Sequence, residues 1–211
     1  NKAIGEVRSL RLVYNWNLHG KYCIDENGNS VIQKRREGRM LEGGPMVDCG
    51  THQIDLASFW LNSDVTRFGS HGAWVDEYEA PDHIWLHMDH ENGAHTMVEM
   101  SYSYHHTAQN AKKEFVYELI GTLGVIRYDA MAKTFVMENG NGTSTFDFHD
   151  PKNFSQMYQE WHHALVTGSS QLLPDAASGA RVIEIARQAT DHVMETALGN
   201  RDECSPCKSS L

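Results

Sequence analysis

Three ionisable side chains at helical spacing are the residues of this sequence best suited to chemistry. Asp48, His52 and Asp55 lie in a segment that predicts a helix from Pro45 to Leu61. At 100° per residue the three directions fall within about 60° of one another, so the side chains share one stripe of the helix. A carboxylate one turn from an imidazole suits proton transfer, because imidazole titrates near neutral pH and the carboxylate can orient it.

The residues around this stripe favour a functional site. Gly43 and Gly44 disfavour helix and suit a tight turn that a ligand can approach, and Pro45 is a favoured first helical residue. Gly50, inside the helix, indicates close approach by another backbone or a ligand. The alternative is an ordinary solvated face, because surface helices often carry Asp and His.

Composition limits the class of protein. A chain of 211 residues with 40% hydrophobic content and five prolines can bury the core of one compact domain. A net charge of -10 and a pI near 5.7 argue against a nucleic-acid binder. No run approaches the roughly 18 apolar residues of a membrane span, and no leader opens the chain, so we expect a soluble, cytoplasmic protein. The chain begins at Asn1 and is expected to be part of something longer.

Cysteine and histidine do not form a recognisable metal or redox motif. The four cysteines are too few and scattered for a disulfide scaffold, and the pair Cys204 and Cys207 lacks the second pair of a zinc site. His83 and His87 alternate with Trp85 on a predicted strand, but nothing in the sequence supplies the third zinc ligand. We therefore expect exposed histidines on a sheet and no metal.

The order of elements predicts the fold class. A strand at 7–15 is followed by a polar segment at 19–42, which is either a solvated loop or a flexible lid whose cluster Lys34, Arg35, Arg36 and Arg39 helps hold an anionic or hydroxylated ligand. After the helix come strands at 65–75, 83–90, 94–104, 114–120, 124–128, 134–137 and 143–148, and then helices at 152–167 and 174–199. Asn92-Gly93 marks a hairpin turn. This order predicts an α+β fold, an open, mostly antiparallel sheet with helices packed on one face.

The segment from Gly43 to Asp55 resembles the G-G-x-x-x-D-x-G-x-H-x-x-D signature of the glucose-fructose oxidoreductase / inositol dehydrogenase (Gfo/Idh/MocA) family. Ile4-Gly5-Glu6-Val7 is similar to the start of the family's C-terminal domain, and 174–199 to its closing helix. The resemblance implies a dihydrodipicolinate-reductase-like C-terminal domain. Residues 1–199 would form a substrate-binding and oligomerisation domain, and 200–211 a flexible tail.

The resemblance also implies an activity. Family members are typically NAD(P)-dependent dehydrogenases of sugars, polyols and related hydroxy compounds, in which a protein base takes the hydroxyl proton. By motif position His52 would be the acid/base, with Asp48 orienting it or contacting a substrate hydroxyl, and Asp55 in a supporting role. Arg39, Tyr14 and Trp16 are further substrate-binding candidates. A homo-oligomer, dimer or tetramer, through the open sheet face would follow.

The sequence departs from the family pattern where the cofactor should bind. The G-x-G-x-x-G turn of a Rossmann domain is absent, and the segment 121–124 predicts a hairpin connection. The family's lysine in an E-K-P motif is also missing, because Lys112-Lys113-Glu114 has neither the order nor the proline. We expect NAD or NADP in the full-length protein and none on this chain alone, which would be inactive by itself.

Two other functions remain open. The chain could be a non-catalytic dimerisation or binding module on the same scaffold. Alternatively, Asp48, His52 and Asp55 could be metal ligands of a hydrolase, although three residues on one helix face rarely converge on an ion.

Overall fold

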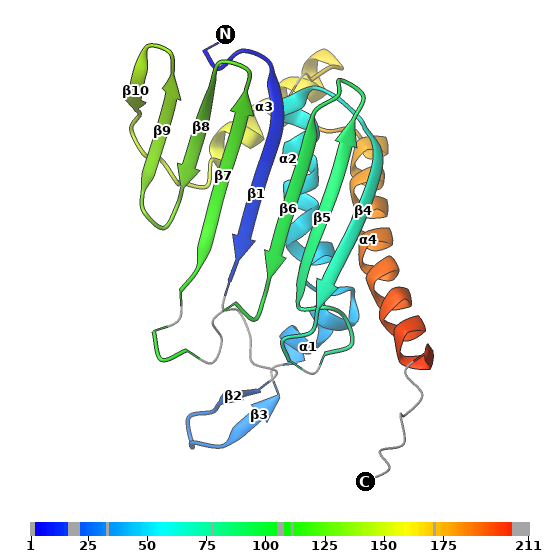
Figure 1. Cartoon of the computed structure of the whole chain (residues 1–211). Coiled ribbons are helices and arrows are strands. Elements are labelled where there is room, and N and C mark those ends of the chain that lie inside the picture. The colour runs from blue at the N-terminus through cyan, green and yellow to red at the C-terminus, as the bar shows by residue number, and fades with distance from the viewer. Residues whose placement is uncertain are drawn as a thin grey trace.

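The computed structural model describes residues 3–16, 22–32, 34–76, 78–104, 108–110, 112–170 and 172–203. Its main feature is an eight-stranded sheet in the order β10-β9-β8-β7-β1-β6-β5-β4 (Figure 1). The strands are β1 (Val7–Asn15), β4 (Val65–Ala73), β5 (His83–His90), β6 (His95–Ser101), β7 (Glu114–Gly121), β8 (Gly124–Asp129), β9 (Thr134–Asn139) and β10 (Gly142–Thr145). A separate hairpin pairs β2 (Tyr22–Ile24) with β3 (Ser30–Ile32).

The helices are α1 (Lys34–Leu41), α2 (Thr51–Leu61), α3 (Phe154–Thr167) and α4 (Ala176–Glu203). A short π-helix, η1 (Met46–Gly50), leads directly into α2. The segment predicted as one helix from Pro45 to Leu61 is therefore a π-helical turn followed by an α-helix. The closing helix continues past Gly199 to Glu203.

The first strand lies in the middle of the sheet. β1 pairs in parallel with β6 and antiparallel with β7, and the other strand pairs of the eight-stranded sheet are antiparallel. Leu10 and Leu12 are fully buried on β1, as a strand with neighbours on both sides requires. The expected open, mostly antiparallel α+β sheet is confirmed, with β1 inserted between two hairpin units.

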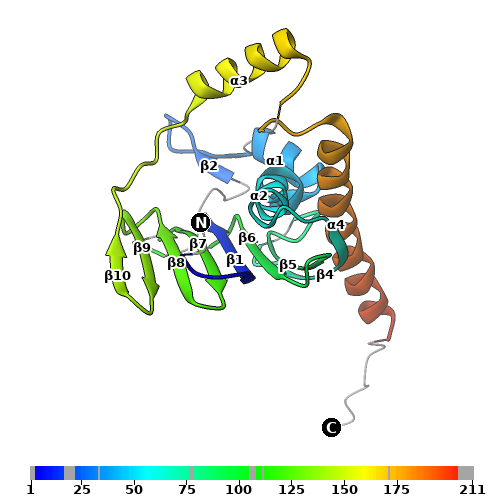
Figure 2. The ribbon, with the colours of Figure 1, turned by 90° about the horizontal axis from the view of Figure 1, so that it is seen from above.

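Two helices cover one face of the sheet. α2 and α4 lie against the half formed by β1, β6, β5 and β4 (Figures 1 and 2). Strand alternation directs Ile84, Leu86 and Met88 of β5 into this layer, where they are fully buried. His83, Trp85 and His87 of the same strand point to the open face. The core between the helices and this half of the sheet fixes α2, and with it the predicted stripe.

The third helix stands apart from the sheet. None of the 14 residues of α3 is buried, and Figure 2 shows the helix on the helical side, away from the strands. Its large apolar side chains Phe154, Met157, Tyr158, Trp161, Leu165 and Val166 are exposed. The expectation that this helix packs on the face of the sheet is therefore wrong for the described residues.

The polar segment 19–42 has more regular structure than predicted. The Asp25 carboxylate accepts hydrogen bonds from the backbone N–H groups of Asn27 and Asn29, at 2.9 and 2.8 Å, which closes the β2–β3 turn. Lys34–Leu41 then forms α1. The turn residues are polar, and α1 has only two turns and is mostly charged, so the sequence pattern resembled a loop. Cys204 and Cys207 lie outside the described residues. No helix in the described part of the chain is long and apolar enough to cross a membrane.

Candidate functional site

Two glycines in left-handed backbone conformations position the candidate site. Gly43 and Gly44 have φ angles of 125° and 69°. A Cβ on Gly44 would lie 3.0 Å from the Pro81 carbonyl oxygen, so the turn has no room for a side chain. The Gly43 carbonyl accepts a hydrogen bond from the Thr190 hydroxyl of α4 at 3.2 Å. The predicted tight turn is confirmed, and it starts η1 in a fixed direction.

The π-helical turn changes the geometry of the predicted stripe. A π-helix has wider turns than an α-helix, so Asp48 in η1 is rotated relative to the α-helical positions of His52 and Asp55. A Cβ on Gly50 would meet the Met46 side chain. The close approach predicted at Gly50 is therefore made by a neighbouring side chain and not by another backbone.

Asp48 is held by two residues from other elements. Its Oδ2 forms an ion pair with Nη1 of Arg39, on α1, at 2.8 Å. The same oxygen accepts a hydrogen bond from the fully buried Tyr102 hydroxyl, just after β6. The Asp48 side chain is 22% exposed to solvent. The carboxylate is thus fixed in direction and still accessible from solvent.

Hydroxyl and thiol groups around Asp48 stay protonated at neutral pH. Burial, reinforced by Cys49 and Asp48, raises the pKa of Tyr102 far above its usual range. Burial and the same two neighbours raise the pKa of Tyr14 to about 12, although Arg39 opposes this. Burial also raises the pKa of the Cys49 thiol, whose Sγ lies 3.3 Å from the Tyr102 oxygen. The groups around the carboxylate are therefore neutral hydrogen-bonding partners.

His52 and Asp55 point to different surroundings. His52 is exposed on α2, and within the described chain it makes no hydrogen bond or ion pair. Asp55 is half-buried and lines a separate hollow of about 590 Å³ between α2 and the start of α4, with Leu172, Pro174, Asp175 and Ser178. The structure brings Asp48 together with Arg39 and Tyr14, leaves His52 free one turn away, and places Asp55 on another hollow.

The aromatic candidates form a continuous row beside Asp48. The rings of Tyr14 and Trp16 lie 5.1 Å apart between centroids. The Lys113 Nζ lies 4.2 Å from the centroid of the Trp16 ring, a cation–π distance. Tyr14 is therefore next to the carboxylate, and Trp16, just after the end of β1, is one ring farther from it.

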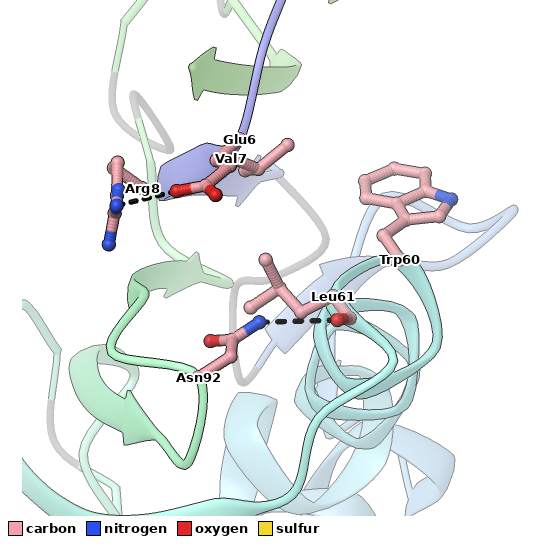
Figure 3. A pocket seen from close by; sticks show the side chains of 6 residues that line it. All are labelled: Glu6, Val7, Arg8, Trp60, Leu61 and Asn92. Carbon is pink, nitrogen blue, oxygen red and sulfur yellow. Dashed lines mark hydrogen bonds and ion pairs between the residues drawn. The ribbon is translucent and has the colours of Figure 1, made fainter. Parts of the chain in front are cut away.

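Another hollow lies at the far end of α2. Figure 3 shows the residues that line it. They are Glu6, just before β1, Val7 and Arg8 of β1, Trp60 and Leu61 of α2, and Asn92 of the β5–β6 turn. Its volume is about 400 Å³, and the Asn92 amide donates to the Leu61 carbonyl at 3.2 Å. Thirteen residues of helix separate Asp48 from Leu61, about 20 Å at 1.5 Å per residue. This hollow is therefore separate from the Asp48 site.

Comparison with known proteins decides the family. Residues 1–127, more than half of the chain, match the GFO/IDH/MocA C-terminal domain. The chain belongs to the GFO/IDH/MocA family. A Bacillus subtilis (strain 168) protein, YteT, provisionally named an oxidoreductase, is 31% identical over 90 residues, which are 43% of this chain and 19% of that protein.

Solved oxidoreductases share the fold at low sequence identity. An aldose-aldose oxidoreductase from Caulobacter crescentus complexed with glycerol has a TM-score of 0.69 at 16% identity, over 92% of this chain and 56% of that chain. An inositol dehydrogenase homolog from Azotobacter vinelandii complexed with NADH and myo-inositol has a TM-score of 0.66 at 16% identity, over 92% and 56%. The UDP-N-acetylglucosamine 3-dehydrogenase GnnA from Acidithiobacillus ferrooxidans has a TM-score of 0.68 at 14% identity, over 91% and 55%. The GFO/IDH/MocA chain thus spans about half the length of these proteins.

The glycines of the β7–β8 turn do not fit a dinucleotide. In this GFO/IDH/MocA chain, a Cβ on Gly121 would meet the Ile4 carbonyl, and one on Gly124 would meet the Glu138 carbonyl oxygen. Both glycines therefore permit close strand packing, and the expected hairpin is confirmed. A phosphate cradle needs a glycine turn that opens a helix, and this turn opens a strand.

Sequence reasoning missed two members of the Asp48 cluster in this family member. Tyr102 follows Val98 and Met100 on the helix-facing side of β6, so the alternation of the predicted strand 94–104 could have placed it there. The sequence indicated no disulfide or metal role for Cys49, and its contact with the Tyr102 hydroxyl was not predicted although it directly follows Asp48. Neither residue carries a spacing signal of its own, because both act through contacts between elements.

Proposed function

We propose that this chain is the substrate-binding and catalytic C-terminal portion of an NAD(P)-dependent dehydrogenase that acts on a hydroxyl group of a sugar, a polyol or a related compound. The observation that carries the proposal is the pairing of a fixed, accessible carboxylate with an unpaired imidazole one turn away. Asp48 is anchored by Arg39 and Tyr102, while His52 is free to exchange a proton with a ligand.

The two residues have different roles in this proposal. The Asp48 carboxylate accepts a hydrogen bond from a substrate hydroxyl, because Arg39 and Tyr102 both contact Oδ2 and a carboxylate offers lone pairs on both of its oxygens. The His52 imidazole takes the hydroxyl proton as the substrate is oxidised. Tyr14, which remains protonated, donates a hydrogen bond to a substrate oxygen, and Arg39 keeps the carboxylate oriented.

The cofactor belongs to residues beyond the described site. The glycine turn between β7 and β8 does not fit a dinucleotide, so no contact with NAD or NADP is assigned to it. When bound to the full-length protein, the nicotinamide would supply the hydride acceptor. Solved relatives complexed with NADH and myo-inositol, or with glycerol, support both the cofactor class and a hydroxylated substrate. We propose residues 1–199 as the functional unit and 200–211 as a tail.

The test uses the full-length protein that contains this chain. Oxidation of a panel of sugars and polyols is followed by nicotinamide absorbance. We expect His52→Ala to lower kcat by about 100-fold or more, the range of general-base catalysis. His162→Ala is the matched control, because His162 is an exposed histidine on α3. Full activity in the His52→Ala protein would contradict the proposal.

A second variant separates the two carboxylates of the stripe. Asp48→Asn keeps the size of the side chain but removes the charge that accepts the substrate hydroxyl, and we expect a rise in KM of about tenfold or more. Asp55→Asn lies on the other hollow and should change KM much less. Equal effects of the two substitutions would contradict the role proposed for Asp48.

We also propose that the protein forms a homo-oligomer through the open face of the sheet. Neither α2 nor α4 covers this face (Figure 2), and it carries an ion-pair network in which Glu118 binds both Arg11 and Arg127. The proposal predicts a dimer or tetramer by light scattering. A clean monomer at micromolar concentration would contradict it.

A further inference from the structure

An aromatic groove lies next to the Asp48 site on the helix-facing side of the sheet. Its volume is about 470 Å³, within the roughly 300–1,000 Å³ typical of small-molecule sites. It is lined by Leu56, Trp60, Phe115, Tyr117, Leu119, Ile126, Tyr128 and Phe135. None of these eight side chains carries a charge, so the groove does not suit a phosphate or a carboxylate.

The groove has a floor and a wall. The floor is formed by β7, β8 and β9, and the wall by Leu56 and Trp60 of α2. Two of the floor rings contact aromatic side chains from the chain after β10: the Phe148 ring stacks on Tyr128 with centroids 5.1 Å apart, and the Phe146 ring lies 5.0 Å from that of Phe135. The aromatic lining suits an apolar group that can make ring contacts.

The ring lining continues into the Asp48 site without a break. Tyr14, which interacts electrostatically with Asp48, lies 5.2 Å from Phe115 between ring centroids. Phe115 lies 4.9 Å from Tyr117, which in turn lies 5.4 Å from Trp60. Burial raises the pKa of Tyr117 to about 12, and the neighbouring side chain of Gln53, the residue after His52, opposes this rise. A molecule bound at Asp48 and His52 can therefore extend directly into the groove.

We propose that the groove binds an uncharged aromatic ring attached to the hydroxylated part of the substrate, so that the substrate is an aryl glycoside or a similar aryl-substituted polyol. This inference rests on the proposed function, because the hydroxylated part is the one held at Asp48. The sugar occupies the polar end beside Asp48, Tyr14 and Arg39, and the aromatic ring packs between Trp60 and the tyrosines of the floor. Offset or edge-to-face contacts with these rings orient it.

The main rival occupant is the apolar face of α3. That helix has exposed apolar side chains and no buried residue, and it begins six residues after Phe148, whose ring stacks on Tyr128. If α3 closed onto the groove, Trp161 would be among the residues that fill it. The test therefore includes Trp161→Ala, which would open the groove if α3 occupied it and would leave binding unchanged if the substrate's ring does.

The test measures binding to the chain by calorimetry with matched probes. These are phenyl and methyl β-glycosides of glucose, galactose, mannose and rhamnose. We expect the phenyl member of at least one pair to bind about tenfold or more tightly, the size that burial of one apolar ring predicts. Trp60→Ala should abolish this preference, while Phe59→Ala, its exposed neighbour on α2, should keep it. Ile126→Asp, which places a charge in the floor, provides a second variant.

Each outcome decides the inference. Equal affinity within all four pairs, or no binding of any probe, overturns it, as does a gain in affinity in Trp161→Ala. If the phenyl preference is absent but Asp48→Asn still weakens the methyl glycosides, the proposed function stands and the groove proposal fails. If Trp60→Ala abolishes the phenyl preference but Asp48→Asn leaves the affinities of both glycosides of the pair unchanged, the groove binds rings and the proposed role of Asp48 fails.

Discussion

Tyr102 and Asp48, which are 54 positions apart in the sequence, are joined by a hydrogen bond from the phenol to the carboxylate. Arg39 approaches the same carboxylate oxygen from α1. The direction of the Asp48 side chain is therefore set by an arginine before its helix and a tyrosine after β6. This arrangement leads to specific expectations for the residues that support it.

Tyr102→Phe removes the hydroxyl and keeps the ring. Asp48 loses a donor and the Cys49 thiol loses its partner, so we expect the free energy of unfolding to fall by about 1–3 kcal/mol, the cost of a lost hydrogen bond to a charged group. Urea denaturation measures this. Tyr158→Phe on the exposed face of α3 should stay within about 0.5 kcal/mol. A Tyr102→Phe protein as stable as the parent would show that the bond contributes nothing.

Gly44→Ala places a Cβ at a left-handed position. The φ of 69° costs about 1–2 kcal/mol for alanine, and the Pro81 carbonyl and the Met40 side chain leave no room for the added methyl group. We expect a clear fall in melting temperature and weaker substrate binding, because the turn directs η1 and Asp48. Gly140→Ala is the control, since its Cβ would meet nothing within 4 Å. Equal melting temperatures of the two variants would contradict the role of the turn.

Asp82→Ala tests the residue that positions the chain around Tyr102. The buried Asp82 carboxylate accepts hydrogen bonds from the backbone N–H groups of Val75 and Asp76, at 2.7 and 3.0 Å, and from the Ser103 hydroxyl. Its backbone carbonyl accepts from the Tyr102 N–H at 2.8 Å.

Removing this carboxylate takes the acceptor from the buried Ser103 hydroxyl and from two part-buried backbone N–H groups. We expect a loss of about 3 kcal/mol or more in unfolding free energy, measured with urea. Asp147→Ala, at an exposed position, should have little effect. A loss no larger in Asp82→Ala than in this control would mean that water replaces the carboxylate.

His90 makes stability depend on pH. Burial lowers the pKa of its imidazole below 6.5, although the Ser63 carbonyl partly opposes this. Nδ1 lies 3.3 Å from that carbonyl oxygen and Nε2 lies 2.9 Å from the Thr96 hydroxyl. Because a carbonyl only accepts, Nδ1 donates and the neutral Nε2 accepts from Thr96.

The lowered pKa of His90 determines the direction of the effect. Above pH 6.5 both folded and unfolded states carry neutral His90, and this contribution to stability is complete. As the pH falls from 6.5 toward the folded pKa, only the unfolded state gains the proton, so unfolding becomes easier by about 1.4 kcal/mol for each pH unit between the unfolded and folded pKa values. Between pH 7.5 and 5 the His90→Gln protein should lose less unfolding free energy than the parent, and the difference should equal the contribution of His90. Exposed His149→Gln should keep the parent's pH dependence, and an unchanged slope in His90→Gln would contradict the assignment.

Elements with strong local patterns were predictable from the sequence. β5 has the predicted bounds, His83–His90, and β1 also has its predicted bounds, Val7–Asn15. Both strands combine alternation or apolar enrichment with clear ends. The Gly43–Gly44 turn was predictable for the same reason, because few other residues adopt positive φ at low cost.

Other features depend on contacts that local patterns do not record. The helix α1 is short and mostly charged, so its residues resembled a solvated loop. The π-helical turn at Met46–Gly50 differs from an α-helix by about one residue per turn, a difference that sequence spacing does not reveal. The place of β1 between β6 and β7 is a long-range pairing.

The sequence by itself determined which residues share a face of each element, because backbone geometry fixes side-chain direction within a helix or strand. It therefore placed Asp48, His52 and Asp55 on one helical segment and predicted the open α+β sheet. Only the tertiary structure decided that Arg39 and Tyr102 hold Asp48, that His52 stays free and that Asp55 faces another hollow. Those contacts join elements far apart in sequence, and they form because burial of the strands and of α2 in a common core brings the elements together.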